Sequence, residues 1–373
     1  MQSIGEQPVH KRWWERLEQF NRVPVDEKRR WLIHTLLNIP PAYLGLQSLS
    51  NLNELQTIFQ PTPGKLPPVN LNLYKERLLS FWQNPYVPFD EPLSLIYALQ
   101  DYALYHDASD STMRLLCEYL IAVANMQRAQ GYLTSAEAST QKAIQLAERR
   151  DYPSLLAKAF YMQSYILCEM HRASFDSNPT QMAQALEYAE KALHITEHYA
   201  VPPLVESAIR ERFATALSLS PRSHRDLSVA RQQNDLARLI TERYQSQHDE
   251  YPLFHRIDQS WHIIGIAHMH LAMKEPKTAL TILKAMPPAQ PGMRRFLTAK
   301  IKEAEATIQA GYLDEGLTIA ESTLSTVKNS PLHLIRLHNL YQDLRNDDRY
   351  TREPSVIQFG FRLVKTHRPD LFQ

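Results

Sequence analysis

The chain contains little glycine. It has nine glycines in 373 residues, where an average usage of about 7% would give about 26. Loops that cradle phosphates and doubly wound nucleotide-binding folds need glycine at tight turns, and neither GxGxxG nor GxxxxGK[ST] occurs in the sequence. The glycine content therefore argues against nucleotide-dependent catalysis.

Cysteine, excess charge and long apolar runs are also scarce. The two cysteines, Cys117 and Cys168, suggest neither a zinc site nor a disulfide framework and are typical of a reducing compartment. Lys and Arg number 41 and Asp and Glu number 40, so no global charge draws the protein to nucleic acid or to a membrane. The N-terminus has no long apolar core behind Lys11 and Arg12, and no window approaches a membrane span. We therefore predict a cytoplasmic protein without a membrane partner.

What the sequence does have is helical periodicity. From about Leu93 to the end, apolar residues recur at spacings of three and four, interrupted by short Pro, Ser, Asn and Asp clusters. Two proline-rich breaks, 59–70 and 84–92, are unsuited to a helix or a central strand. The predicted organisation is a small N-terminal unit (1–58), a proline-rich linker with one helix (59–92) and a helical array with C-terminal capping helices (93–373).

The array shows a weak internal repeat. The segment from Trp261 to His268, WHIIGIAH, resembles the first helix of a tetratricopeptide repeat, W-x-x-L-G-x-x-Y. Two GYL segments, at Gly131 and Gly311, resemble the turn of the repeat, and small residues such as Gly265 would let helices approach closely. Helix pairs are expected at 110–150, 153–199, 202–244, 254–286 and 293–328, with a capping pair from Pro331. The prediction is an all-α, tetratricopeptide-like right-handed solenoid, and the alternative is an all-α bundle without repeats.

The first 46 residues resemble a different family. Ile4-Gly5, Val9 and Trp14-Glu15 are similar to the turn and third helix of a Cro-like (XRE-type) helix-turn-helix domain. The segment 36–46, LLNIPPAYLGL, resembles a group of bacterial transcriptional regulators that join such a domain to a tetratricopeptide array. Leu17 occupies a position where the commonest form has glycine, and helix one and most of helix two would need about twenty residues before Ile4. The resemblance implies a partial helix-turn-helix unit, which belongs either to a longer natural chain or to a remnant that no longer binds DNA.

If the unit binds DNA, polar side chains early in its recognition helix should contact bases and phosphates. These candidates are Gln7, His10, Lys11 and Arg12. The alternative is a plain amphipathic helix, because residues 1–31 carry seven basic and five acidic side chains, a weak excess of two.

No motif points to catalysis, a cofactor or a metal. His194 and His198 lie one helical turn apart, but the intervening residues do not form HExxH and no third ligand is evident. A solvated helix face is the simpler interpretation. No Ser-His-Asp or Cys-His set is recognisable from local spacing. We therefore predict a protein that is not an enzyme and has no cofactor and no bound metal.

The tetratricopeptide register assigns several side chains to a concave groove on the first helices of the pairs. They are Asn125, Arg128, Tyr161, Tyr165, His262 and Met269. Asn and Arg can bind a peptide backbone or carboxylate, and Tyr and Met supply adaptable apolar contact. The alternative is that these residues pack or solvate the inner surface of the array.

By resemblance, the protein is expected to be a transcriptional regulator. A peptide or protein ligand in the groove would control DNA binding by the N-terminal unit, and a homodimer would set the spacing of two recognition helices. The alternative is a scaffold or adaptor that binds a protein partner and does not bind DNA.

Overall fold

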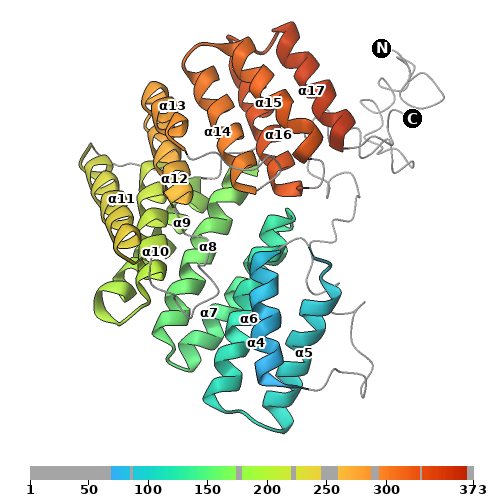
Figure 1. The fold of residues 1–373 in the computed structure, drawn as a ribbon, viewed down its shortest axis with the longest axis vertical. Helices are drawn as coiled ribbons and strands as arrows, with labels where there is room; N and C mark the ends of the chain where they lie inside the picture. The colour runs from blue at the N-terminus through green and yellow to red at the C-terminus, as the bar shows by residue number, and fades with distance from the viewer. Residues whose placement is uncertain are drawn as a thin grey trace, which may run out of the picture.

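A computed structural model describes residues 69–84, 87–173, 179–219, 224–244, 259–286, 294–327 and 330–367. In these ranges every regular element is an α-helix, which confirms the all-α prediction (Figure 1). The candidate DNA-binding residues Gln7, His10, Lys11 and Arg12 lie outside the described residues. Within the described part of the chain, no helix is both long and apolar enough to cross a membrane.

The described helices are α4 (Leu71–Gln83), α5 (Asp90–Tyr105), α6 (Asp110–Ala129), α7 (Leu133–Arg149), α8 (Pro153–Ala173), α9 (Pro179–His198), α10 (Pro203–Leu219), α11 (His224–Tyr244), α12 (Gln259–Ala272), α13 (Pro276–Lys284), α14 (Arg294–Gln309), α15 (Leu313–Val327), α16 (Pro331–Asn346) and α17 (Pro354–His367). From α6 onward the described helices occupy the ranges in which helix pairs were expected, whereas α4 and α5 precede those ranges. Six of them begin at proline, whose fixed φ and missing N–H suit the first helical position. Each pair from α6·α7 to α16·α17 packs together along the chain.

The two GYL segments form the same turn. Gly131 (φ +86°) ends α6 and Gly311 (φ +98°) ends α14, both in the left-handed region that glycine adopts without strain. After each glycine, the tyrosine N–H donates to a carbonyl five residues back, at 2.8 Å for Tyr132 and 3.1 Å for Tyr312. The sequence repeat therefore corresponds to a repeated helix ending that starts the return helix.

The first helices of the pairs contact one another in order. Helix α6 packs on α8, α8 on α10, α10 on α12, α12 on α14 and α14 on α16. Helix α16 also packs on α8 and on α6, so the array turns back until its last pair meets its first (Figure 1). The inner faces of these first helices are thereby brought together, and this is where the candidate site lies.

The core is divided along the array. One cluster of buried apolar side chains runs from α4 to α12, a second joins α14 to α17, and a third joins α12, α13 and α14. Helix α4, from the segment expected to be a linker, belongs to the first cluster. Its Tyr74, Leu78 and Phe81 are buried, and its Tyr74 carbonyl accepts a 2.7 Å hydrogen bond from the Tyr119 hydroxyl of α6.

Gly316 shows why small residues occur where paired helices cross. A methyl group added to it would overlap the Ile308 side chain and lie 2.9 Å from the Ala304 carbonyl oxygen of α14. We expect Gly316→Ala to lower the free energy of unfolding by about 1–3 kcal/mol, as overpacking does, although alanine favours helix. Urea denaturation measures the change. Ser322→Ala, at an exposed position of the same helix, should change the stability by less than about 0.5 kcal/mol.

A candidate ligand site on the inner helices

Three arginines from three helices surround one tyrosine on the inner side of the array. Arg128 in the last turn of α6 and Arg212 of α10 each place a guanidinium carbon over the Tyr165 ring, 4.2 and 4.1 Å from its centroid. Arg336 of α16 contacts Tyr165 as well and lowers its pKa. We call Arg128, Tyr165, Arg212 and Arg336 the arginine–tyrosine cluster. Guanidinium groups stack well on aromatic faces, which explains how two of them share one ring.

Helix α8 supplies the centre of the cluster because its polar residues recur every four positions. Tyr161, Tyr165 and Glu169 lie on one face of the helix. The Tyr161 and Tyr165 ring centroids are 6.2 Å apart in an edge-to-face arrangement. The Glu169 Oε1 atom accepts a 2.6 Å hydrogen bond from Arg336 Nη2 in a pair that is almost fully buried. This ion pair joins the last helix pair of the array to α8.

A second acidic group lies beside the cluster on α10. Glu211 precedes Arg212, and its Oε2 atom is 3.1 Å from Nδ1 of His262 on α12. Burial raises the pKa of this carboxyl, and His262 opposes the rise. A Cβ at Gly265 of α12 would overlap the Glu211 carboxylate. Glycine at the centre of the WHIIGIAH segment therefore leaves the space in which a buried acid packs against the neighbouring helix.

The cluster holds more positive charge than its described surroundings neutralise. Three guanidinium groups, those of Arg128, Arg212 and Arg336, lie near two carboxylates, those of Glu169 and Glu211. Arg128 donates from Nη2 to Asn125 Oδ1 at 2.9 Å, but its Nε and Nη1 atoms are buried and have no hydrogen-bond partner among the described residues. Buried donors without partners are rare and need an explanation. The arrangement is suited to accepting one anionic group.

The same charges change the titration of Tyr165. Burial alone would raise the pKa of its hydroxyl, but Arg128, Arg336 and Arg212 together outweigh burial and Glu169 and lower the pKa to about 8. A tyrosine in the unfolded chain has a pKa of about 10. Between pH 8 and pH 10 the unfolded chain therefore binds more protons than the folded protein. The contribution of Tyr165 to stability is therefore complete above about pH 10 and is lost as the pH falls through about 8.

The lowered pKa predicts that Tyr165 of the native protein ionises to a phenolate at a lower pH than an ordinary tyrosine. Ultraviolet absorbance of tyrosinate should show one titration with a midpoint near pH 8, and Tyr165→Phe should remove it. Tyr161→Phe is the matched control, since burial raises the pKa of Tyr161 above the ordinary value. An unchanged titration curve in Tyr165→Phe would show that the arginines do not act on this hydroxyl.

The structure brings together four of the six side chains assigned to the groove from sequence. Asn125, Arg128, Tyr161 and Tyr165 lie in or beside the arginine–tyrosine cluster. His262 contacts Glu211 on one side, and its Nε2 atom lies 2.6 Å from Thr241 Oγ1 on the other. Met269 of α12 packs in the apolar core that runs from α4 to α12. All except Tyr165 are less than 9% exposed, so the side chains fill the inner space themselves.

Four charged residues of the site, Glu169, Glu211, Arg212 and Arg336, were not predicted from sequence. Glu169 continues the four-residue spacing of Tyr161 and Tyr165, a signal that could have identified it. Arg212 lies in the third helix pair, whose repeat register was the weakest. Arg336 lies in the expected capping pair, and nothing in the local sequence shows that this pair returns to α6 and α8.

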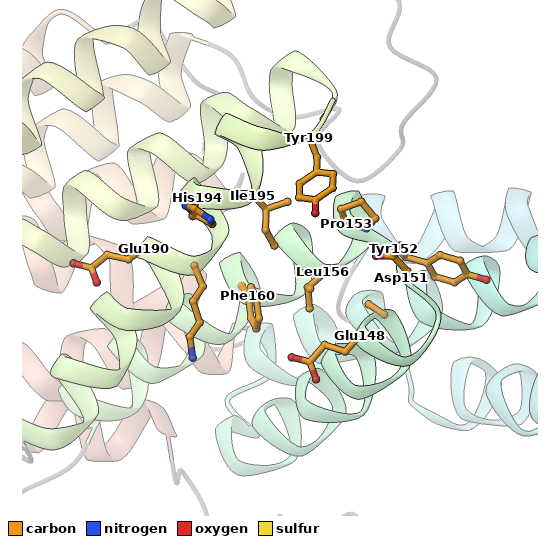
Figure 2. A pocket seen from close by; sticks show the side chains of 12 residues that line it. Glu148, Asp151, Tyr152, Pro153, Leu156, Phe160, Glu190, His194, Ile195 and Tyr199 are labelled. Carbon is orange, nitrogen blue, oxygen red and sulfur yellow. The ribbon is translucent and has the colours of Figure 1, made fainter.

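A second concave region lies where α7, α8 and α9 meet. A pocket of about 660 Å³ is lined by residues of α7, α8 and α9. Figure 2 shows Leu156, Phe160 and Ile195 in the middle of this lining, with the charged Glu148 and Glu190 toward its edge. No buried charge points to the kind of ligand that this pocket would take, so the arginine–tyrosine cluster is the stronger candidate for the ligand site.

Comparisons of the chain with protein-family models, with curated proteins and with solved structures gave no match.

Proposed function

We propose that this protein is a cytoplasmic transcriptional regulator whose tetratricopeptide-like array binds a peptide or protein ligand at the arginine–tyrosine cluster. The six successive helix pairs, the repeated glycine turn and the contacts between first helices support a solenoid of this kind. Cys117 and Cys168 are both buried thiols, as expected in a reducing compartment. DNA binding is assigned by resemblance to residues 1–58.

The ligand is proposed to carry a carboxylate into the cluster. The observation that carries this proposal is the charge imbalance around Tyr165, together with the buried Nε and Nη1 atoms of Arg128, for which the described part of the chain supplies no hydrogen-bond partner. A carboxylate would supply the missing negative charge and accept charge-assisted hydrogen bonds from the guanidinium groups. A C-terminal carboxylate or an Asp or Glu side chain of a peptide has the required chemistry.

Ligand entry is proposed to shift the array between two curvatures. The cluster is enclosed because α16 packs on α6 and α8, and the Arg336–Glu169 pair joins them. A ligand that binds better when α16 has moved away favours the more open array, to the extent of its differential affinity for the two states. In a homodimer, a change of curvature would alter the spacing of two DNA-binding units.

Two matched peptide pools test the ligand class. One pool is rich in Asp and Glu and has free C-termini, and the other replaces these residues with Asn and Gln and has amidated C-termini. The melting temperature of the full chain should rise with the acidic pool alone, because a ligand that binds only the folded state stabilises it. Equal shifts with both pools, or no shift with either, would contradict carboxylate recognition.

Salt-dependent binding to random-sequence duplex DNA tests the regulatory half of the proposal. The intact chain should bind DNA, and Lys11→Ala/Arg12→Ala should lower both the affinity and the salt slope, by about one unit for each lost phosphate contact. Absence of DNA binding by the intact protein would leave the alternative, a scaffold for a protein partner. The genomic sequence upstream of Met1 separates the two further, because an in-frame extension with two helix patterns would complete the helix-turn-helix.

A further inference from the structure

The C-terminal end of α9 presents three metal-binding side chains to solvent. His194, Glu197 and His198 are all exposed, and one ligand atom from each lies within 4.8 Å of the others. We propose that these three residues bind a divalent transition-metal ion of the Zn²⁺ class. The proposed metal site lies on α9. It is independent of the arginine–tyrosine cluster, whose residues come from α6, α8, α10 and α16.

Helix geometry brings the ligands together. His194 and His198 are four residues apart, so their rings stack on one face with centroids 4.1 Å apart. Glu197, three residues after His194, lies on the same side. With metal–ligand bonds of about 2.0–2.1 Å, tetrahedral ligand atoms are about 3.4 Å apart. Exposed side chains can rotate over the remaining ångström or so, which buried ones could not.

The backbone already orients one of the imidazoles. The His198 Nδ1 atom lies 2.8 Å from the carbonyl oxygen of His194. A carbonyl oxygen can only accept, so Nδ1 carries the proton and donates it, which leaves the lone pair of Nε2 directed away from the helix. Metal-binding histidines are commonly fixed in this way by a carbonyl that accepts from the other ring nitrogen. The second histidine of the site is therefore held in the tautomer that a metal needs.

Charge and donor type indicate which ion fits. The site lies at the C-terminal end of α9, with His198 in the last turn, where the helix dipole favours a cation. Two imidazoles and one carboxylate suit Zn²⁺, Cu²⁺ or Ni²⁺, whereas Mg²⁺ and Ca²⁺ prefer sets made only of oxygen. Three protein ligands leave a fourth tetrahedral position for water. Because His194 also lines the 660 Å³ pocket (Figure 2), the ion would lie at the edge of that pocket.

Titration of the full chain with Zn²⁺, followed by calorimetry, tests the proposal. The chain has fifteen histidines, so the site is identified by difference: His194→Gln/His198→Gln should bind one Zn²⁺ fewer than the unaltered protein. Glu197→Gln should keep the site but bind at least about tenfold more weakly, since loss of even an outer partner costs that much. Circular dichroism checks that each variant is folded.

His106→Gln is the matched control. His106 is exposed and has no second histidine one helical turn away, so its replacement should leave the stoichiometry and affinity for Zn²⁺ unchanged. If the double variant binds as many Zn²⁺ ions as the unaltered protein and with equal affinity, the proposal is overturned. The same holds if His106→Gln removes as much binding as the double variant does.

Discussion

Glu169→Gln should lower the free energy of unfolding by about 3–5 kcal/mol, because it removes one partner of a buried ion pair. Glu169 accepts a 2.6 Å hydrogen bond from Arg336, and its side chain is 3% exposed. Its loss would leave the three arginines of the cluster near a single remaining carboxylate, that of Glu211. Urea denaturation of both proteins at neutral pH measures the difference.

Two further variants separate a buried charge effect from a general loss of packing. Combining Glu169→Gln with Arg336→Met removes both charges and should recover much of the lost stability, since an apolar replacement of a buried pair is often close to neutral. Glu242→Gln breaks the Arg238–Glu242 pair of α11, whose side chains are half exposed, and should cost less than about 0.5 kcal/mol. Equal losses in Glu169→Gln and Glu242→Gln would contradict the account.

Tyr165→Ala should also lower the free energy of unfolding by about 3–5 kcal/mol, the usual range for removing a large aromatic side chain from a packed site. The Tyr165 ring lies between the guanidinium groups of Arg128 and Arg212. Without the ring, these two positive charges would lose their stacking partner and lie across an empty space. The melting temperature and urea denaturation both report this change.

Tyr165→Phe isolates the part of the effect that the ring itself carries. Phenylalanine keeps the surface on which both arginines stack and removes only the hydroxyl, which should cost about 1 kcal/mol. Tyr199→Ala is the control for tyrosine removal at an exposed position, with 53% of the residue accessible, and should change the stability little. If Tyr165→Ala and Tyr165→Phe are equally stable, the ring does not hold the arginines in place.

The helix pairs were predictable because local sequence determines them. Apolar residues at three- and four-residue spacing and the Pro, Ser, Asn and Asp clusters that interrupt them placed the pairs, and the two GYL segments marked turns where Gly131 and Gly311 adopt positive φ. These features depend on a few neighbouring residues, so one sequence was enough. The solenoid itself and the helix-turn-helix unit stay predictions.

The candidate site was only partly predictable because its members come from distant helices. Asn125, Arg128, Tyr161 and Tyr165 follow from the repeat register on α6 and α8. Arg336 joins them from much further along the chain: it donates a hydrogen bond to Glu169, which precedes it by 167 residues. Such a contact depends on the summed curvature of every intervening pair, which periodicity does not specify.

The central claim is that Arg128 of the arginine–tyrosine cluster serves to receive an anion and contributes little to the stability of the fold. Measuring both the stability and the acidic-peptide binding of Arg128→Met tests it most directly. Arg128 is 2% exposed and has two partnerless donors, so methionine should leave the free energy of unfolding unchanged or higher, while the melting-temperature rise with the acidic pool disappears. A variant that loses stability and yet keeps the full response to the acidic pool would contradict the account.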